Sequence, residues 1–257
     1  MYPIDLSGKN GIVFGVANDK SIAWSIAETL HKAGANLALT YQNERLKSRV
    51  ARLVEQWDNV TLWECDVTDS NQIGEVFQEL KGRYGSISFV VHSVAFANRE
   101  DLLGAFSETS REGFMKALDV SAYSLIPIAK YAAPLMVEGG SIVTITFHAS
   151  EKVYPGYNVM GTAKAALENE VKQLAAEMGP NEIRVNALSP GPLDTLAARG
   201  IGGFLDMKHA HEQRSPLRRN TTHEEVGNAA LFLCSELSSG ITGTILPVDG
   251  GYHIMGV

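Results

Sequence analysis

Two tyrosines and a lysine follow one another closely in the segment TFHASEKVYPGYNVMGTAK, residues 146–164. A phenol can donate a hydrogen bond to an oxygen that gains charge, and an ammonium group can bind hydroxyls or anions. Tyr157 and Lys164 are seven residues apart, so they share one face of a helix that begins at about Asn158. Gly161, four residues after Tyr157, has no side chain to contribute. The spacing predicts a cleft into which Tyr157 and Lys164 both point.

The neighbours of this pair give it two further properties. No obvious carboxylate partner for Lys164 lies nearby on that helix face, and an inward lysine without one usually has a task, such as holding ribose hydroxyls. A salt-bridged surface lysine remains the alternative. Phe147 lies at the end of the preceding apolar run, beside Tyr157, and has no donor. We therefore expect Phe147 to line a pocket without taking part in proton chemistry.

The elements that must position these residues alternate along the chain. Short apolar runs rich in β-branched residues are separated by segments with helical spacing, such as Ile22, Ile26 and Leu30. Near-continuous apolar strands indicate a sheet covered on both faces, and hence parallel strands joined by helices. The pattern predicts an α/β fold, a single-domain Rossmann-type doubly wound parallel sheet of about seven strands spanning residues 1–257. The predicted strands are 11–15, 36–41, 60–67, 87–95, 141–146, 183–189 and 244–249.

Ligands of such sheets bind where the strands end, so we examined the residues after each run. Gly15 permits a sharp turn after the first run, and Ser21 precedes a helix start whose free N–H groups could face a pyrophosphate. The motif is not a strict G-x-G-x-x-G, and an ordinary strand-to-helix turn remains an alternative. The second run ends in Gln42 and Asn43, which suit ribose hydroxyls, whereas Arg45 is the one nearby cation that could bind a 2′-phosphate. We therefore expect NADH to be preferred over NADPH.

The third and fourth runs end beside the same expected groove. Asp66 could accept a hydrogen bond from an adenine amino group, or it could instead cap the next helix. Val67 could pack on the adenine ring or simply in the core. Ser93 and Ala95 would run beside the cofactor ribose.

Composition and charge exclude several classes of function. The formal charge of −7 disfavours nucleic acid as a partner, and no apolar run approaches the length of a membrane helix. The N-terminal segment does not read as an export signal, so we expect a cytoplasmic protein. Cys65 and Cys234 are far apart and are expected to be buried bystanders. His209 and His211 would diverge on a helix, so we expect no metal site.

At this point the chain resembles the bacterial enoyl-acyl-carrier-protein reductases of the short-chain dehydrogenase/reductase superfamily, over almost its whole length. Tyr157-x6-Lys164 within YNVMGTAKAALE is the most specific feature, since the carbonyl-reducing relatives have Tyr-x3-Lys. The other matching motifs are Gly15-x5-Ser21-x-Ala23, TYQNERL, HSVAFA, VSAYSL, RVNALSPGP, PLRRN and EEVGNAALFL.

The resemblance implies reduction of the trans-2 double bond of an enoyl thioester by NADH in fatty acid synthesis. Tyr157 would donate to the thioester oxygen, Lys164 would bind the nicotinamide ribose, and residues 196–211 would form a lid over the substrate. It also implies a homotetramer and an acyl carrier protein as the partner that delivers the acyl group. The residues that would contact the dinucleotide are Gly15, Ser21, Ile22, Gln42, Asp66, Val67, Ser93, Ala95, Lys164, Gly191, Leu193 and Thr195. Those that would line the acyl pocket are Phe96, Tyr123, Phe147, Tyr157, Pro192, Phe204 and Met207.

The chain departs from the family pattern at three places. Phe147 replaces the second tyrosine of most members, as it does in the mycobacterial-type branch. SPGP followed by Asp194 replaces SAGP and an arginine, and the expected lid reads GGFLDM instead of a basic sequence. These departures leave two alternatives, a related reductase acting on another activated alkene or carbonyl compound, and a dinucleotide-binding regulator without turnover. The intact Tyr157 and Lys164 argue against the regulator.

Overall fold

Seven parallel strands form one sheet in the computed structural model, which describes residues 4–256. Their order across the sheet is β3-β2-β1-β4-β5-β6-β7, which confirms the Rossmann-type doubly wound sheet expected from the sequence. The chain reverses its direction of winding between β1 and β4, and this is the point where such sheets bind ligands. The strands are β1 (Asn10–Phe14), β2 (Asn36–Tyr41), β3 (Val60–Glu64), β4 (Phe89–His92), β5 (Gly140–Ile145), β6 (Ile183–Pro190) and β7 (Ile245–Val248).

Two of the predicted strands were too long, and the difference matters for the site. The third run was expected to extend to residue 67 and the fourth to residue 95, but the strands end at Glu64 and His92. Strand pairing with both neighbours of β4 stops at His92, so the apolar residues that follow are loop residues. The loops after β3 and β4 therefore begin early enough to carry Asp66, Ser93 and Ala95 at the sheet edge.

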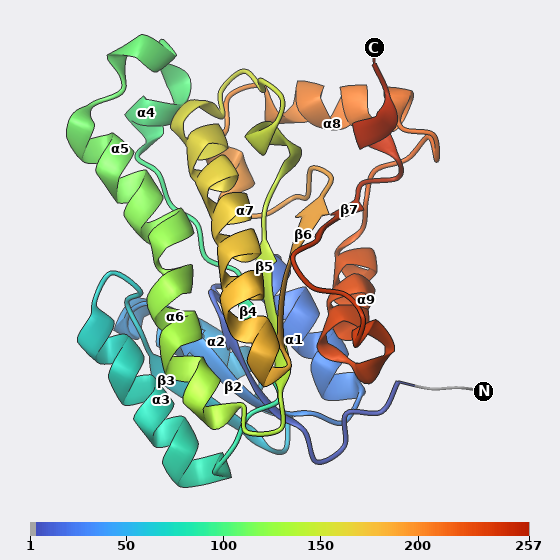
Figure 1. Cartoon of the computed structure of the whole chain (residues 1–257). Coiled ribbons are helices and arrows are strands. Elements are labelled where there is room, and N and C mark those ends of the chain that lie inside the picture. The colour runs from blue at the N-terminus through green and yellow to red at the C-terminus, as the bar shows by residue number, and fades with distance from the viewer. Residues whose placement is uncertain (1–3, 257) are drawn as a thin grey trace.

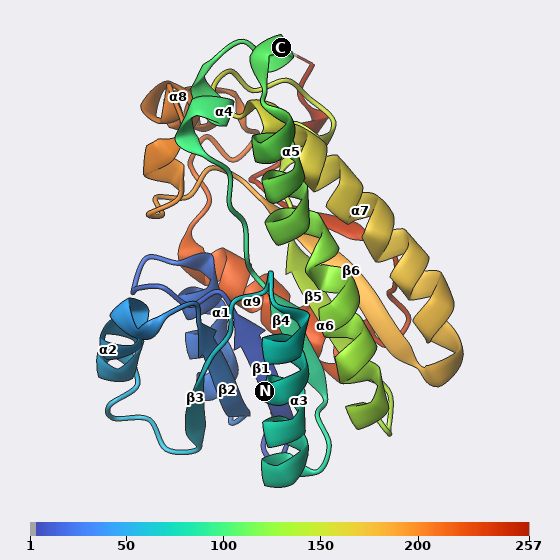
Figure 2. The same ribbon diagram turned by 90° about the vertical axis from the view of Figure 1, so that its left-hand side faces the viewer.

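Helices cover both faces of the sheet, as Figures 1 and 2 show. Helices α3, α6 and α7 lie on one face, and α1, α2 and α9 on the other, while α4, α5 and α8 lie toward the carboxyl ends of the strands (Figure 1). The helices are α1 (Ile22–Lys32), α2 (Glu44–Leu53), α3 (Ser70–Tyr84), α4 (Arg99–Leu103), α5 (Arg111–Leu118), α6 (Leu125–Ala132), α7 (Asn158–Met178), α8 (Phe204–Arg214) and α9 (His223–Cys234).

Each face of the sheet has its own hydrophobic core because successive strand residues point to opposite sides. Ile12 and Phe14 of β1 pack with the α3, α6 and α7 residues, whereas Val13 between them packs with α1 and α9. All three are fully buried. This burial on both sides explains the near-continuous hydrophobicity of the strand sequences, and it holds the strand ends rigidly beneath the loops of the site.

Both cysteines are buried and free, which confirms the expectation that they are bystanders. Burial raises the pKa of each thiol to about 12, so neither is a reactive thiolate near neutral pH. Between residues 4 and 256, none of the helices combines the length and the apolar character that crossing a bilayer requires.

Candidate active site

Helix α7 begins directly after Tyr157 and so places this residue at the carboxyl edge of the sheet. Its first residue, Asn158, has a left-handed φ of 27° and donates from Nδ2 to the Gly104 carbonyl oxygen at 2.7 Å. This bond ties the start of α7 to the end of α4. Burial raises the pKa of the Tyr157 phenol well above its usual range. The phenol therefore stays protonated near neutral pH and can act as a hydrogen-bond donor.

Lys164 lies two turns further along α7 and is only 4% exposed. Its Nζ donates to the Ile145 carbonyl oxygen at 2.7 Å, at the end of β5. The surface alternative is therefore wrong, and the inward orientation is confirmed. Burial lowers the pKa of Lys164 to about 8, because an ammonium group is costly away from water.

The expectation that Lys164 lacks a carboxylate neighbour was wrong. Glu168, one turn further along the same helix, is buried, and its charge raises the pKa of Lys164 against the effect of burial. Glu168 Oε1 accepts a hydrogen bond from Thr146 Oγ1 at 2.6 Å. The carboxylate is thus held by the residue that follows β5 and acts on Lys164 through charge, without a direct ion pair.

The crowding around Gly161 explains why the lysine follows the tyrosine by seven residues. A Cβ atom at position 161 would lie 2.8 Å from the Ala149 carbonyl oxygen, closer than real Cβ contacts. A lysine four residues after Tyr157 would require the backbone at Ala149 to move. The position one turn later, at Lys164, opens toward the end of β5 instead.

The loop after β1, which we call the Gly15 cradle, has a conformation that requires glycine at position 15. Gly15 has a φ of +95°, and a Cβ there would lie 2.1 Å from the Ser93 carbonyl oxygen. Ser21 precedes α1, and its Oγ donates to the Asn18 carbonyl oxygen at 2.7 Å and does not cap the helix. The first turn of α1 contains no acidic residue. The N-terminal end of α1, with Ile22 as its first residue, therefore offers unpaired N–H groups and a positive dipole end to a phosphate.

Gln42 and Asp66 meet across the ends of β2 and β3. Gln42 Nε2 donates to Asp66 Oδ2 at 3.3 Å, while Asp66 Oδ1 accepts from the Thr68 amide and hydroxyl. Burial alone would raise the pKa of Asp66, but these hydrogen bonds outweigh it and lower the pKa. The helix-cap alternative for Asp66 was wrong, since Asp69 caps α3 by accepting from the Asn71 amide.

The remaining dinucleotide candidates lie around the same strand ends. Val67 packs into the core under α3, Ser93 is partly buried and Ala95 is exposed. After β6, the Gly191 amide donates to the Val248 carbonyl oxygen, Leu193 is buried, and Thr195 Oγ1 accepts from the Ala198 amide. These residues all lie in loops that follow strands β3, β4 and β6, at the carboxyl edge of the sheet.

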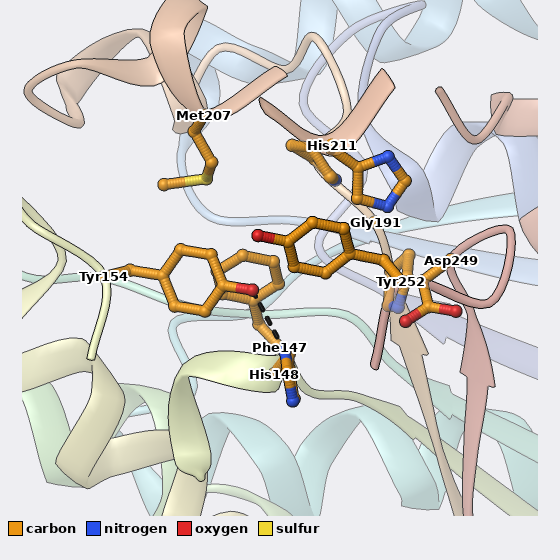
Figure 3. A pocket seen from close by; sticks show the side chains of 10 residues that line it. Phe147, His148, Tyr154, Gly191, Met207, His211, Asp249 and Tyr252 are labelled. Carbon is orange, nitrogen blue, oxygen red and sulfur yellow. Dashed lines mark hydrogen bonds between the residues drawn. The ribbon is translucent and has the colours of Figure 1, made fainter. Parts of the chain in front are cut away.

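A cavity of about 10 Å³ lies between the end of β6, the segment before α7, the residues after β7 and helix α8 (Figure 3). Among the expected acyl-pocket residues, Phe147, Pro192 and Met207 line it, and the Tyr157 ring contacts Phe147. Phe96 and Tyr123 lie elsewhere and are about half exposed, whereas Phe204 is buried beneath α8. The residues that line the cavity are Phe147, His148, Tyr154, Pro190, Gly191, Pro192, Met207, His211, Asp249 and Tyr252.

Six of these lining residues were not among the site residues predicted from the sequence: His148, Tyr154, Pro190, His211, Asp249 and Tyr252. Asp249 and Tyr252 follow β7 directly, so the rule that sites lie after strand ends could have found them. His211 could not be found this way, because it reaches the cavity only through the packing of α8. It is 3% exposed and stacks on Tyr252 with ring centroids 4.8 Å apart.

The two histidines of α8 diverge, as their spacing predicts. His211 faces the cavity, whereas His209 is exposed and pairs with Gln213. Within the described part of the chain, no cluster of three or more His, Cys, Asp or Glu side chains could hold a metal ion.

Comparison with known proteins gives consistent matches over nearly the whole chain. A family model described as enoyl-(acyl carrier protein) reductase matches residues 15–253. The NADH-dependent reductase FabI of a Nostoc species is 49% identical over 99% of this chain and 100% of its own length. That of Bacillus subtilis is 50% identical over 97% of each chain.

Solved structures of the same group superpose closely. The Bacillus cereus enoyl-acyl carrier protein reductase with NADP⁺ and indole naphthyridinone has a TM-score of 0.97 at 48% identity, covering 99% of this chain and 100% of that one. The Anaplasma phagocytophilum reductase in complex with NAD has a TM-score of 0.95 at 46% identity, covering 99% and 97%.

Proposed function

The chain belongs to the enoyl-(acyl carrier protein) reductase family, and from this premise we propose how its own residues perform the reaction. The protein reduces the double bond of an enoyl thioester with NADH, a step of fatty acid synthesis. The observation that carries the residue assignment is the pair at the start of α7, where the protonated phenol of Tyr157 directly precedes the helix and buried Lys164 lies two turns further on.

The nicotinamide, when bound, supplies the hydride that adds to the β-carbon of the enoyl thioester. Negative charge then collects on the thioester oxygen, and we assign to the Tyr157 hydroxyl the donation of a hydrogen bond to that oxygen. Such a donor stabilises charge that develops in the transition state. Because burial keeps the phenol protonated, it can donate at neutral pH without prior activation.

Lys164 is assigned to the nicotinamide ribose. An ammonium group has three N–H donors, and in the described structure Nζ gives one to Ile145 and finds no other protein acceptor. The remaining donors can bind ribose hydroxyls, and the charge adds positive potential near the thioester oxygen. The Gly15 cradle and the α1 N-terminus fit a pyrophosphate, and Gln42 with Asp66 fits the adenosine end.

The domain and its lid belong to the same proposal. We assign the whole chain to one reductase domain, with residues 196–211 as the lid over the acyl group. Within that segment Phe204 and His211 are buried against the body, whereas Leu205 is 76% exposed. This pattern of burial supports a lid helix that is held against the pocket by a few buried side chains.

We also propose that the protein forms a homotetramer and is located in the cytoplasm. The buried, unpaired thiols of Cys65 and Cys234 fit a reducing compartment. The tetramer rests on the resemblance to the family, and light scattering of the purified protein measures it directly.

The reaction itself can be tested with a crotonyl thioester and either dinucleotide. We expect steady oxidation of NADH, with kcat/KM at least about tenfold higher than with NADPH, since no fixed cation ends β2. Gln42 and Asn43 are neutral and exposed there. Arg45→Ala is the matched variant and should leave the ratio unchanged. A preference for NADPH that disappears in Arg45→Ala would instead make Arg45 the phosphate ligand.

Delivery by an acyl carrier protein can be tested separately. Acyl carrier proteins are acidic, and the candidate docking cations in or just after the expected lid are Lys208, Arg214, Arg218 and Arg219. Two of these four are paired with carboxylates. Lys208 Nζ lies 3.7 Å from Asp194 Oδ2. Arg219 donates to the Glu225 carboxylate from both Nη1 and Nη2. Arg218 donates to the Gln213 carbonyl oxygen, and Arg214 is exposed. We therefore propose that docking is weak.

The expected result is a kcat/KM for one acyl chain that is similar on the carrier protein and on CoA, within about threefold. Raising the salt from about 20 to about 200 mM should change this ratio little, because few unpaired charges are available to be screened. Arg214→Ala and Arg218→Ala test the two exposed candidates that form no ion pair in the described structure. A large carrier advantage that salt removes would contradict weak docking, and the enoyl reductase activity would stand regardless.

A further inference from the structure

A row of ring contacts connects Tyr157 with a second tyrosine at the cavity. The Phe147 ring stands between the two, with its centroid 5.1 Å from that of Tyr157 and 4.9 Å from that of Tyr154. Both contacts are tilted, at 57° and 48°, an arrangement favourable for aromatic pairs. Phe147 thus transmits the position of one tyrosine ring to the other.

Tyr154 is in turn held by His148. The Tyr154 hydroxyl and His148 Nδ1 are 3.0 Å apart, the bond drawn in Figure 3. Burial lowers the pKa of His148, so the ring is neutral near pH 7 and the hydroxyl can donate to Nδ1. The His148 ring is in turn in edge-on contact with the Tyr252 ring, with centroids 6.3 Å apart. Tyr154 therefore has little freedom to turn away from Phe147.

Tyr157 lacks such a bond of its own. Burial alone raises the pKa of its phenol, with no hydrogen bond from residues 4–256 contributing, and the proposed role requires the hydroxyl to stay available for the substrate. The segment before it is mostly exposed, with Val153 at 95%. The direction of the Tyr157 ring is consequently set by packing against Phe147 and against the buried cluster of Leu102, Ala117, Val159, Met160 and Ala163.

We propose that Tyr154, fixed by His148, is a positioning residue that orients the Tyr157 ring through Phe147. The inference rests on the proposed role of Tyr157 and goes beyond it, since Tyr154 does not touch the reacting atoms. A hydrogen-bond donor must point at the charged oxygen to stabilise it, and small errors in its position are costly. Tyr154 should therefore affect the turnover step and leave dinucleotide binding unaffected.

The experiment compares two substitutions of Tyr154 in the full-length enzyme with a crotonyl thioester. Tyr154→Leu removes the ring contact, and kcat should fall about 3- to 10-fold, the value of one aromatic pair. Tyr154→Phe keeps the ring and loses only the bond to His148, so it should restore most of the rate. KM for NADH should stay unchanged in both. Tyr131→Phe, on α6 and far from the cavity, is the matched control with the parent rate.

A double-substitution cycle then separates positioning from a general structural effect. In a Tyr157→Phe background there is no hydroxyl left to orient, so Tyr154→Leu should lower the residual kcat no further. An equal fall in both backgrounds would overturn the proposal, because Tyr154 would then act independently of Tyr157. A Tyr154→Leu enzyme with parent kcat, or one whose KM for NADH rises instead, would overturn it as well. If the Tyr157→Phe enzyme turns over like the parent, the proposed role of Tyr157 is wrong. That outcome tests the proposed function and is distinguishable from the outcomes that test Tyr154.

Discussion

Replacing Tyr157 by phenylalanine is expected to lower kcat about 10²- to 10³-fold, the usual cost of removing one donor to a developing oxyanion. The ring and its contact with Phe147 remain in this variant, so only the hydroxyl is lost. NADH binding should be nearly unchanged, because the hydroxyl is assigned to the thioester oxygen and not to the dinucleotide. Steady-state kcat and the fluorescence-derived Kd for NADH measure the two effects independently.

Tyr84→Phe provides the control for this substitution. Tyr84 is a partly buried residue at the end of α3, and its hydroxyl donates to the Leu37 carbonyl oxygen. The substitution removes this hydroxyl, which has no role in the proposed site. Its kcat should match that of the parent. Comparable losses in the two variants, or a Tyr157→Phe enzyme that binds NADH poorly, would contradict the assignment of Tyr157.

Much of the fold could be predicted because strand burial leaves a strong pattern. All seven apolar runs became strands of one sheet, since burial on both faces of the inner strands favours apolar side chains at most positions. The strand ends were less predictable. Val67 and Val94 are apolar and continue the pattern, but they lie beyond the last paired residues of β3 and β4. Composition does not indicate where two strands stop being neighbours.

The common location of the proposed dinucleotide residues was predictable for the same topological reason. Gly15, Gln42, Asp66 and Ser93 each follow a strand, and parallel strands bring such residues to one edge. Features that depend on contacts formed only in the folded chain were not predictable. The clash that excludes a side chain at Gly161 involves the backbone of Ala149, and the charge acting on Lys164 comes from Glu168 after both are buried.

The aromatic lining of the cavity was the least predictable part. His148, His211 and Tyr252 come from three segments separated by some 40 to 60 residues, and only the folded chain brings their rings together. An aromatic residue in a helix or a loop has no sequence feature that distinguishes packing in a core from lining a pocket. The sequence therefore predicted Tyr157 and Lys164 as candidate chemical residues, but not the aromatic residues that line the cavity beside them.

The second large effect is expected at Lys164. Lys164→Ala should raise the Kd for NADH roughly 10- to 150-fold, since hydrogen bonds from a charged group contribute about 1.5–3 kcal/mol each. Lys172→Ala is the matched control, because Lys172 lies on the same helix and is exposed. A normal Kd in Lys164→Ala would refute the ribose assignment.

The pH dependence gives Lys164 a signature that simple loss of packing cannot reproduce. Burial lowers the pKa of its ammonium group to about 8, so the group is charged below that pH and neutral above it. The charged form favours binding, and NADH affinity should therefore weaken as pH rises through about 8. Bound ribose hydroxyls stabilise the ammonium, which shifts the loss upward in the complex and makes the Kd rise progressively. Burial raises the pKa of the Tyr157 phenol, which stays protonated over this range, so the change is not due to Tyr157. In Lys164→Ala the Kd should be high and independent of pH across the same range, measured by NADH fluorescence. A pH dependence that survives the substitution would assign the titration to another group.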